Sequence, residues 1–106
     1  MPRLTCLLLT ILPCLPAAAA PLSAERAQEL QNLLQQDCGS CHGMRLTGGL
    51  GPALTAQALA GKPRELLVAT IRDGRPGTPM PPWKTLLGED DIAWLVETLM
   101  QAGQTP

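Results

Sequence analysis

The 106-residue sequence contains no phenylalanine and no tyrosine, and its only large aromatic residues are Trp83 and Trp94. Aromatic side chains bury the largest apolar areas in small domains, so their scarcity limits the core that this chain builds alone. If the first 20 residues are removed as a leader segment, about 86 residues remain, which is at the lower edge of what an apolar core stabilises without help. We therefore expect a bound apolar group to complete the core.

Histidine occurs once, as His42, and acidic and basic residues nearly balance, which gives a formal net charge of −1. A single imidazole excludes, within one chain, a metal site that needs two histidines, and it leaves no second histidine for a catalytic pair. The small net charge does not favour nucleic acid as a partner. These absences favour a carrier over an enzyme.

The single histidine directly follows a pair of cysteines, so that Cys38, Cys41 and His42 form a Cys-x-x-Cys-His motif. This is the attachment motif of c-type haem. Each thiol adds to one vinyl group of the haem, and the histidine becomes an axial ligand of the iron. The motif predicts one covalently bound haem c, which would supply the missing apolar core.

Two other sites use a similar pair of cysteines. A zinc site needs two more ligands, and only carboxylates remain if the first two cysteines of the chain are removed with a leader segment. A thioredoxin-like redox pair favours a preceding strand, whereas the residues before Cys38 have helical spacing. The haem interpretation is therefore preferred over both.

Residues 1–19 have the pattern of a secretory signal peptide, with an apolar run over residues 4–15 and small residues at Ala17 and Ala19. A retained membrane anchor is disfavoured because the run is short and interrupted by two prolines. We expect cleavage to leave one small haem-binding domain, residues 20–106, with no attachment to the membrane. Covalent haem attachment occurs outside the cytoplasm, which predicts the periplasm of a bacterium.

Apolar residues at helical spacing predict three helices and one short helical turn. Pro63 is expected at the first position of its helix, and Gly74 is expected to end that helix. The acidic residues at 89–91 suit the positive end of the last helix dipole. The expected segments are residues 24–37, 56–60, 64–73 and a last helix that begins near residue 89 and carries an apolar stripe to residue 100.

Four prolines fall within residues 75–83, and they make a stiff loop that presents Met80. Of the competing methionines, Met44 lies too close to His42 to reach the opposite haem face, and Met100 lies on the last helix. A thioether suits low-spin iron, so Met80 is expected as the second axial ligand. The alternative is an open distal position, as in a haem sensor or enzyme. Trp83 is expected to pack beside the haem.

A glycine-rich segment, residues 44–55, follows the motif and contains Gly51 and Pro52. The Pro52 carbonyl is placed to accept the ring N–H of His42, which would fix the tautomer and strengthen the ring as a ligand. The alternative is a simple turn, since Gly-Pro is common in loops.

Charge is unevenly distributed along the chain. Residues 45–84 hold six basic and two acidic residues, a net charge of +4, whereas residues 85–106 hold acidic residues only. An ordinary solvated surface is one interpretation. Our hypothesis is that the basic segment surrounds the exposed haem edge and steers an acidic redox partner into a transient complex.

Taken in order, these features resemble the class I cytochromes c: a helix into Cys38-x-x-Cys41-His42, then Gly51-Pro52, then Met80 in a proline loop, then a last helix. The resemblance implies an all-α fold of about four helices around one haem, with His42 and Met80 as axial ligands and the first and last helices crossing. That family usually has aromatic residues at the crossing. Here Leu33 or Leu34 and Thr98 stand there, so we expect a looser crossing.

Residues 50–55 and 74–83 further resemble the small NirC-type cytochromes encoded beside cytochrome-cd nitrite reductase in denitrifying bacteria. This resemblance implies a carrier of single electrons that donates to nitrite reductase. An accessory role in the maturation of that enzyme or its special haem remains the alternative.

Overall fold

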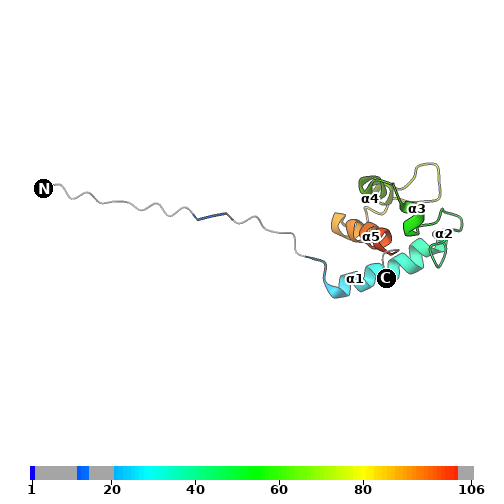
Figure 1. Cartoon of the computed structure of the whole chain (residues 1–106), viewed down its shortest axis with the longest axis horizontal. Helices are drawn as coiled ribbons and strands as arrows, with labels where there is room; N and C mark the ends of the chain where they lie inside the picture. Colours follow the sequence, from blue (N-terminus) through cyan, green and yellow to red (C-terminus); the bar gives the residue numbers. More distant parts are fainter. Residues whose placement is uncertain (2–11, 15–20, 103–106) are drawn as a thin grey trace.

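The computed structural model describes residues 1, 12–14 and 21–102, and in that part the regular elements are all helical (Figure 1). The elements are α1 (Ala24–Leu33), η1 (Leu34–Cys38), α2 (Gly39–His42), α3 (Ala56–Leu59), α4 (Arg64–Asp73) and α5 (Glu89–Gln101). The predicted all-α class is confirmed. None of the described helices is long and apolar enough to span a membrane. The expected signal peptide, 1–19, lies outside the described residues apart from 1 and 12–14.

The first helical segment runs on through the haem motif instead of ending before it. Ser23 caps it, because its Oγ accepts the N–H of Arg26 at 3.1 Å. The middle of the segment, η1, is a π-helix that closes with a hydrogen bond from the N–H of Gly39 to the carbonyl of Leu34. The helix predicted over residues 24–37 is therefore too short, and the π-turn was not anticipated. As a result, the two cysteines and the histidine lie on one continuous helical segment formed by α1, η1 and α2, which we call the helical rod.

The predicted helical turn and the following helix are present as α3 and α4. Thr55 caps α3, with its Oγ1 accepting the N–H of Ala58 at 3.2 Å. Pro63 precedes α4 as its N-cap, so its predicted place as the first helical residue is wrong by one position. Gly74 ends α4 with a φ of +69°, which a residue with a side chain rarely adopts. This turn folds the Met80 loop back against the end of α4.

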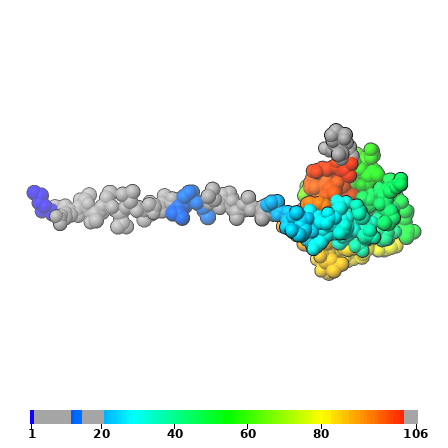
Figure 2. Space-filling view, turned by 90° about the horizontal axis from the view of Figure 1, so that it is seen from below, coloured from blue at the N-terminus to red at the C-terminus, as the bar shows by residue number. Residues whose placement is uncertain are grey.

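α5 packs against α1, α3 and α4 and supplies much of the core. Leu34 is buried, whereas Leu33 is only partly buried, so Leu34 is the leucine that belongs to the core. Thr98 donates its hydroxyl to the Trp94 carbonyl of its own helix at 2.8 Å. The space-filling view shows α1 (cyan) along one face of the folded part, continued by the segment after α2 (green) (Figure 2). Buried residues of this core are aliphatic: Leu30, Leu34, Leu59, Leu87, Ile92, Leu95, Val96 and Leu99.

An ion pair joins the beginnings of α1 and α5. The Arg26 guanidinium donates from Nε and Nη2 to the two carboxylate oxygens of Asp91, at 3.0 and 2.8 Å. Asp91 also accepts the N–H of Gly88 at 3.0 Å, which caps α5. Its pKa lies below the usual aspartate range because Arg26 donates to the ionised form. This pair adds a polar link between two helices whose buried contacts are otherwise aliphatic.

Candidate haem-binding site

A cavity of about 870 Å³ opens between the helical rod, α4, α5 and the Met80 loop. Its volume lies in the upper part of the range of ordinary cofactor and ligand sites. Every site residue predicted from the sequence lines this one cavity: Cys38, Cys41, His42, Pro52, Met80 and Trp83. Met80 is the sole methionine of the described residues in the lining. The structure therefore brings together six residues spread over 46 positions of the chain.

The two thiols lie one helical turn apart on the rod, so both reach the same wall of the cavity. Both are unpaired, and both are partly buried. Burial, together with the neighbouring Asp37 carboxylate, raises the pKa of the Cys38 thiol. Cys38 and Cys41 form no disulfide with each other.

The loop after α2 fixes the position of the His42 ring. The ring Nδ1 lies 2.7 Å from the Pro52 carbonyl oxygen, which is the hydrogen bond expected from the sequence. A carbonyl only accepts, so this contact requires the proton on Nδ1 and leaves the Nε2 lone pair free to bind a metal.

Gly51 makes that approach possible, and sequence analysis had missed the reason. A Cβ at Gly51 would lie 2.8 Å from both Nδ1 and Cε1 of His42, closer than real Cβ atoms come. The N–H of Gly51 also donates to the Cys41 carbonyl at 2.8 Å. Its position between the motif and Pro52 is the signal that close approach, and not only loop flexibility, requires glycine here.

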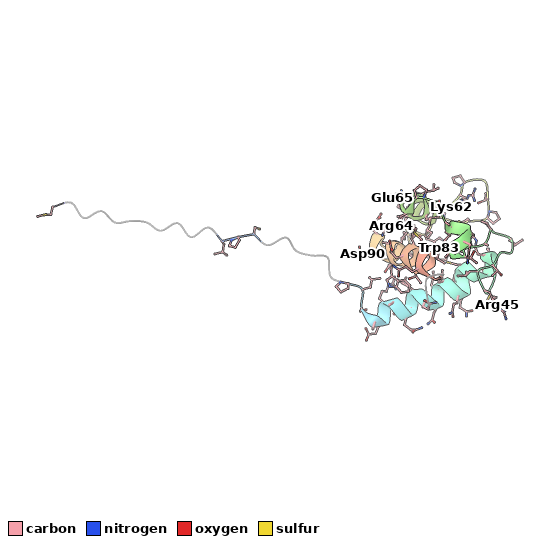
Figure 3. The ribbon with its side chains drawn as sticks, viewed as in Figure 1. Arg45, Lys62, Arg64, Glu65, Trp83 and Asp90 are labelled. Atoms are coloured by element: carbon pink, nitrogen blue, oxygen red, sulfur yellow. The ribbon has the colours of Figure 1, made fainter. Side chains whose placement is uncertain are left out.

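Two backbone hydrogen bonds hold the Met80 loop against the end of α4. The N–H groups of Trp83 and Lys84 donate to the carbonyls of Ile71 and Arg72, at 3.1 and 3.2 Å. Trp83 packs against the core and lies among the helices (Figure 3). These bonds hold Met80 and Trp83 in the cavity wall as one unit.

The lining fits a large apolar group that carries its own metal ligands. Leu66 is 52% exposed and Leu50 is 91% exposed although both line the cavity, so a bound group would cover apolar surface that water now touches. Within the part of the chain that the structure describes, no three His, Cys, Asp or Glu residues gather to hold a bare metal ion. A porphyrin supplies four nitrogen ligands, so the chain needs to add only axial ones.

Ion pairing reduces the basic surface expected from the sequence. Arg64 pairs with Glu97, and Arg72 and Lys84 pair with Asp73. In the described part of the chain, the basic residues of residues 45–84 without an ion pair are Arg45, Lys62 and Arg75.

Two of these three unpaired basic residues line the cavity. Lys62 and Arg75 line the cavity, whereas Arg45 lies at the opposite end of the folded part from the labelled α4 residues (Figure 3). Of the basic residues expected to surround the exposed haem edge, only two therefore remain as unpaired charges at the cavity in the described part of the chain.

Comparisons with known proteins agree with this geometry. Residues 25–97 match the family model described as cytochrome c oxidase, cbb3-type, subunit III. The chain is 62% identical over 92 residues to cytochrome c55X of Stutzerimonas stutzeri, covering 87% of this chain and 80% of that protein.

Two solved structures are similar in fold and sequence. A c-type cytochrome NirC aligns with a TM-score of 0.75 and 62% identity, over 80% of this chain and all (100%) of that one. The dihydro-heme d1 dehydrogenase NirN, in complex with DHE, aligns with a TM-score of 0.62 and 32% identity, over 67% of this chain and 15% of that one. The chain therefore belongs to the cytochrome c family, and it is a NirC-type cytochrome that binds haem c covalently.

Proposed function

We propose that this cytochrome, an electron carrier and not an enzyme, works in the periplasm and passes single electrons to nitrite reductase in denitrification. His42 and Met80 are the proposed axial ligands, and Cys38 and Cys41 the proposed points of attachment. The observation that carries the proposal is that these four residues line one cavity of cofactor size. When bound, the haem supplies the one-electron chemistry, and the chain sets the conditions for it.

Each proposed ligand has a distinct task. Cys38 and Cys41 fix the cofactor to the helical rod, and His42 is oriented by its hydrogen bond to Pro52. Met80 would supply a thioether to the iron, which would raise the reduction potential relative to harder ligands. With His42 and Met80 both bound to the haem iron, no substrate would have access to the metal, which suits a carrier.

Export is proposed from the sequence pattern of residues 1–19. The predicted cleavage leaves residues 20–106 as a domain without a membrane anchor. A transient complex with nitrite reductase would use the cavity edge, where Lys62 and Arg75 line the cavity without an ion pair in the described part of the chain. Two such charges favour an acidic docking surface on the partner.

The test uses the exported holoprotein and the oxidised nitrite reductase of the same bacterium. We expect the mass of the protein to exceed that of the bare chain by one haem. We also expect the reduced cytochrome to be oxidised rapidly on mixing with the reductase, and its absorption spectrum measures this oxidation. Carrier function predicts that nitrite then drives multiple turnovers. A colourless protein of bare-chain mass would remove the whole proposal, and a coloured protein that is not oxidised by the reductase would remove this partner.

A second candidate is an accessory role in making the special haem of nitrite reductase. The similarity to part of the dehydrogenase NirN supports it, because an oxidation step needs an electron acceptor. Deletion of the gene separates the two roles. Fully assembled reductase that lacks only its electron supply favours the carrier, whereas reductase without its special haem favours maturation.

A further inference from the structure

The Met80 loop contains few groups that can hold it in place. Prolines at positions 76, 79, 81 and 82 carry no backbone N–H, so they donate nothing to the loop. Its conformation depends on the remaining N–H groups and on the one hydroxyl side chain in the segment, that of Thr78.

Thr78 lies at the centre of the hydrogen bonds that close the loop. Its Oγ1 donates to the Arg75 carbonyl at 2.6 Å, and its own N–H donates to the same oxygen at 3.1 Å. The N–H of Met80 donates to Thr78 Oγ1 at 3.3 Å. The hydroxyl therefore acts as donor and acceptor at once, and it connects the first residue of the loop to the methionine.

A second bond closes the loop around this hydroxyl. The N–H of Arg75 donates to the Met80 carbonyl at 3.2 Å, so both backbone groups of Met80 are held by residues of the loop itself. The Met80 carbonyl lies against Gly74, where a Cβ would approach it to 2.8 Å. The Met80 backbone thus has a defined position, from which its side chain reaches the cavity wall.

We propose that Thr78 is the positioning residue for Met80: its hydroxyl fixes the Met80 backbone so that the thioether remains on the iron and the second axial position stays closed. The inference rests on the proposed ligation by Met80. Loss of the hydroxyl leaves the Met80 N–H to water and removes one of the two hydrogen bonds that Thr78 donates to the Arg75 carbonyl. The thioether then dissociates more often, and small ligands compete with it more successfully.

The test compares the wild-type ferric holoprotein with Thr78→Val, which keeps the shape and loses the hydroxyl, and with Thr78→Ser, which keeps the hydroxyl. The readouts are the long-wavelength absorption band of thioether-bound ferric haem, the pH at which it disappears, and the affinity for added imidazole. Thr78→Val should bind imidazole about five- to tenfold more tightly and lose the band at lower pH, as loss of the partner of the Met80 N–H predicts. Thr78→Ser should behave as wild type.

Thr98→Val is the matched control, because the Thr98 hydroxyl bonds only within α5, to the Trp94 carbonyl. It should change neither imidazole affinity nor the band. The covalent haem keeps the variants measurable even if the loop loosens, and Thr78→Ala is a second variant without the hydroxyl.

The outcomes separate this inference from the proposed function. A wild-type protein without the thioether band would remove Met80 ligation itself. A wild-type protein that has the band, with Thr78→Val and Thr78→Ala unchanged from it, would overturn the inference alone. An equal effect in Thr78→Ser or Thr98→Val would overturn it as well, because the hydroxyl of Thr78 would then not be the cause.

Discussion

The Nδ1 of His42 lies 2.7 Å from the carbonyl oxygen of Pro52, ten residues further along the chain. Gly51 stands between them in the sequence and against the imidazole in space. A carbonyl at this position directs the other ring nitrogen towards the cavity. The proximal side of the site is thus set by a three-residue arrangement of histidine, glycine and proline.

Gly51→Ala tests this arrangement. The added Cβ would meet the imidazole at 2.8 Å, so the ring must turn away from Pro52. A weaker hydrogen bond between His42 and Pro52 lowers electron donation from the imidazole to the iron. We therefore expect a higher reduction potential and a lower yield of holoprotein. Voltammetry and the haem content of the purified protein measure the two effects.

Gly88→Ala is the control for that substitution, because the nearest atom to its Cβ would be a carboxylate oxygen of Asp91 at an ordinary 3.8 Å. It should leave the potential unchanged. An unchanged potential in Gly51→Ala as well would mean that the ring keeps its orientation without this glycine.

Met80→Ala tests the distal side. If Met80 closes the second axial position, reduced wild-type protein binds carbon monoxide slowly or not at all, and the variant binds it readily. Stopped-flow absorption on mixing with carbon monoxide measures this difference. Met44→Leu is the control, since Met44 is 65% exposed and is not part of the cavity lining. Ready binding by the wild-type protein would favour the alternative of a sensor or enzyme with an open distal position.

The sequence predicted the residues that line the cavity better than the elements that hold them. Cys38, Cys41 and His42 form a local sequence motif, and Met80 is flanked by prolines. All four residues can therefore be identified from the sequence alone. The π-turn of η1 cannot, because Leu30, Leu34 and Cys38 have the four-residue spacing that a regular α-helix also produces. Helical periodicity shows which residues face the core but does not show a change from one helix type to another.

Contacts between distant segments were also beyond the sequence. Arg26 and Asp91 are 65 positions apart, and each alone resembles an ordinary charged residue near the start of a helix. The hydroxyl of Thr78 likewise has no visible role until the loop is folded. These residues act through tertiary geometry, which neither composition nor periodicity contains.

Removal of the haem should unfold much of the domain. The cavity of about 870 Å³ is lined by residues of all the helical elements, so without the cofactor many apolar side chains lose a partner. Cys38→Ala/Cys41→Ala, expressed in the periplasm, should show weak, non-cooperative thermal unfolding by circular dichroism compared with the holoprotein. A sharp transition at the holoprotein temperature would show instead that the aliphatic core suffices.

Asp91→Asn tests the link between α1 and α5. Arg26 lowers the pKa of Asp91 in the folded state, so its stabilisation is fully present above the pKa of an unfolded aspartate and is lost as pH falls through the lower folded value. Asparagine keeps one oxygen that can accept the Gly88 N–H, so the substitution removes chiefly the charge that pairs with Arg26. The variant should therefore be less stable at pH 7, and the difference from wild type should shrink below about pH 4.

Chemical denaturation of both proteins across this pH range measures that difference. Glu29→Gln is its control, because it removes only the exposed partner of Arg26. A difference between Asp91→Asn and wild type that does not change with pH would contradict the ionised pair as the cause.

Charge reversal at the cavity edge tests electrostatic docking. Lys62→Glu and Arg75→Glu replace the two unpaired basic residues of the lining, whereas Arg45→Glu makes the same change at a residue outside the lining. If an acidic partner docks at the cavity, each of the first two variants should slow electron transfer about three- to tenfold at low ionic strength, and the third should not. Screening by salt should reduce the difference between the variants and wild type. Equal rates for all three variants, or a wild-type rate that does not respond to salt, would exclude steering by these charges and leave the apolar surface around Leu50 to form the contact.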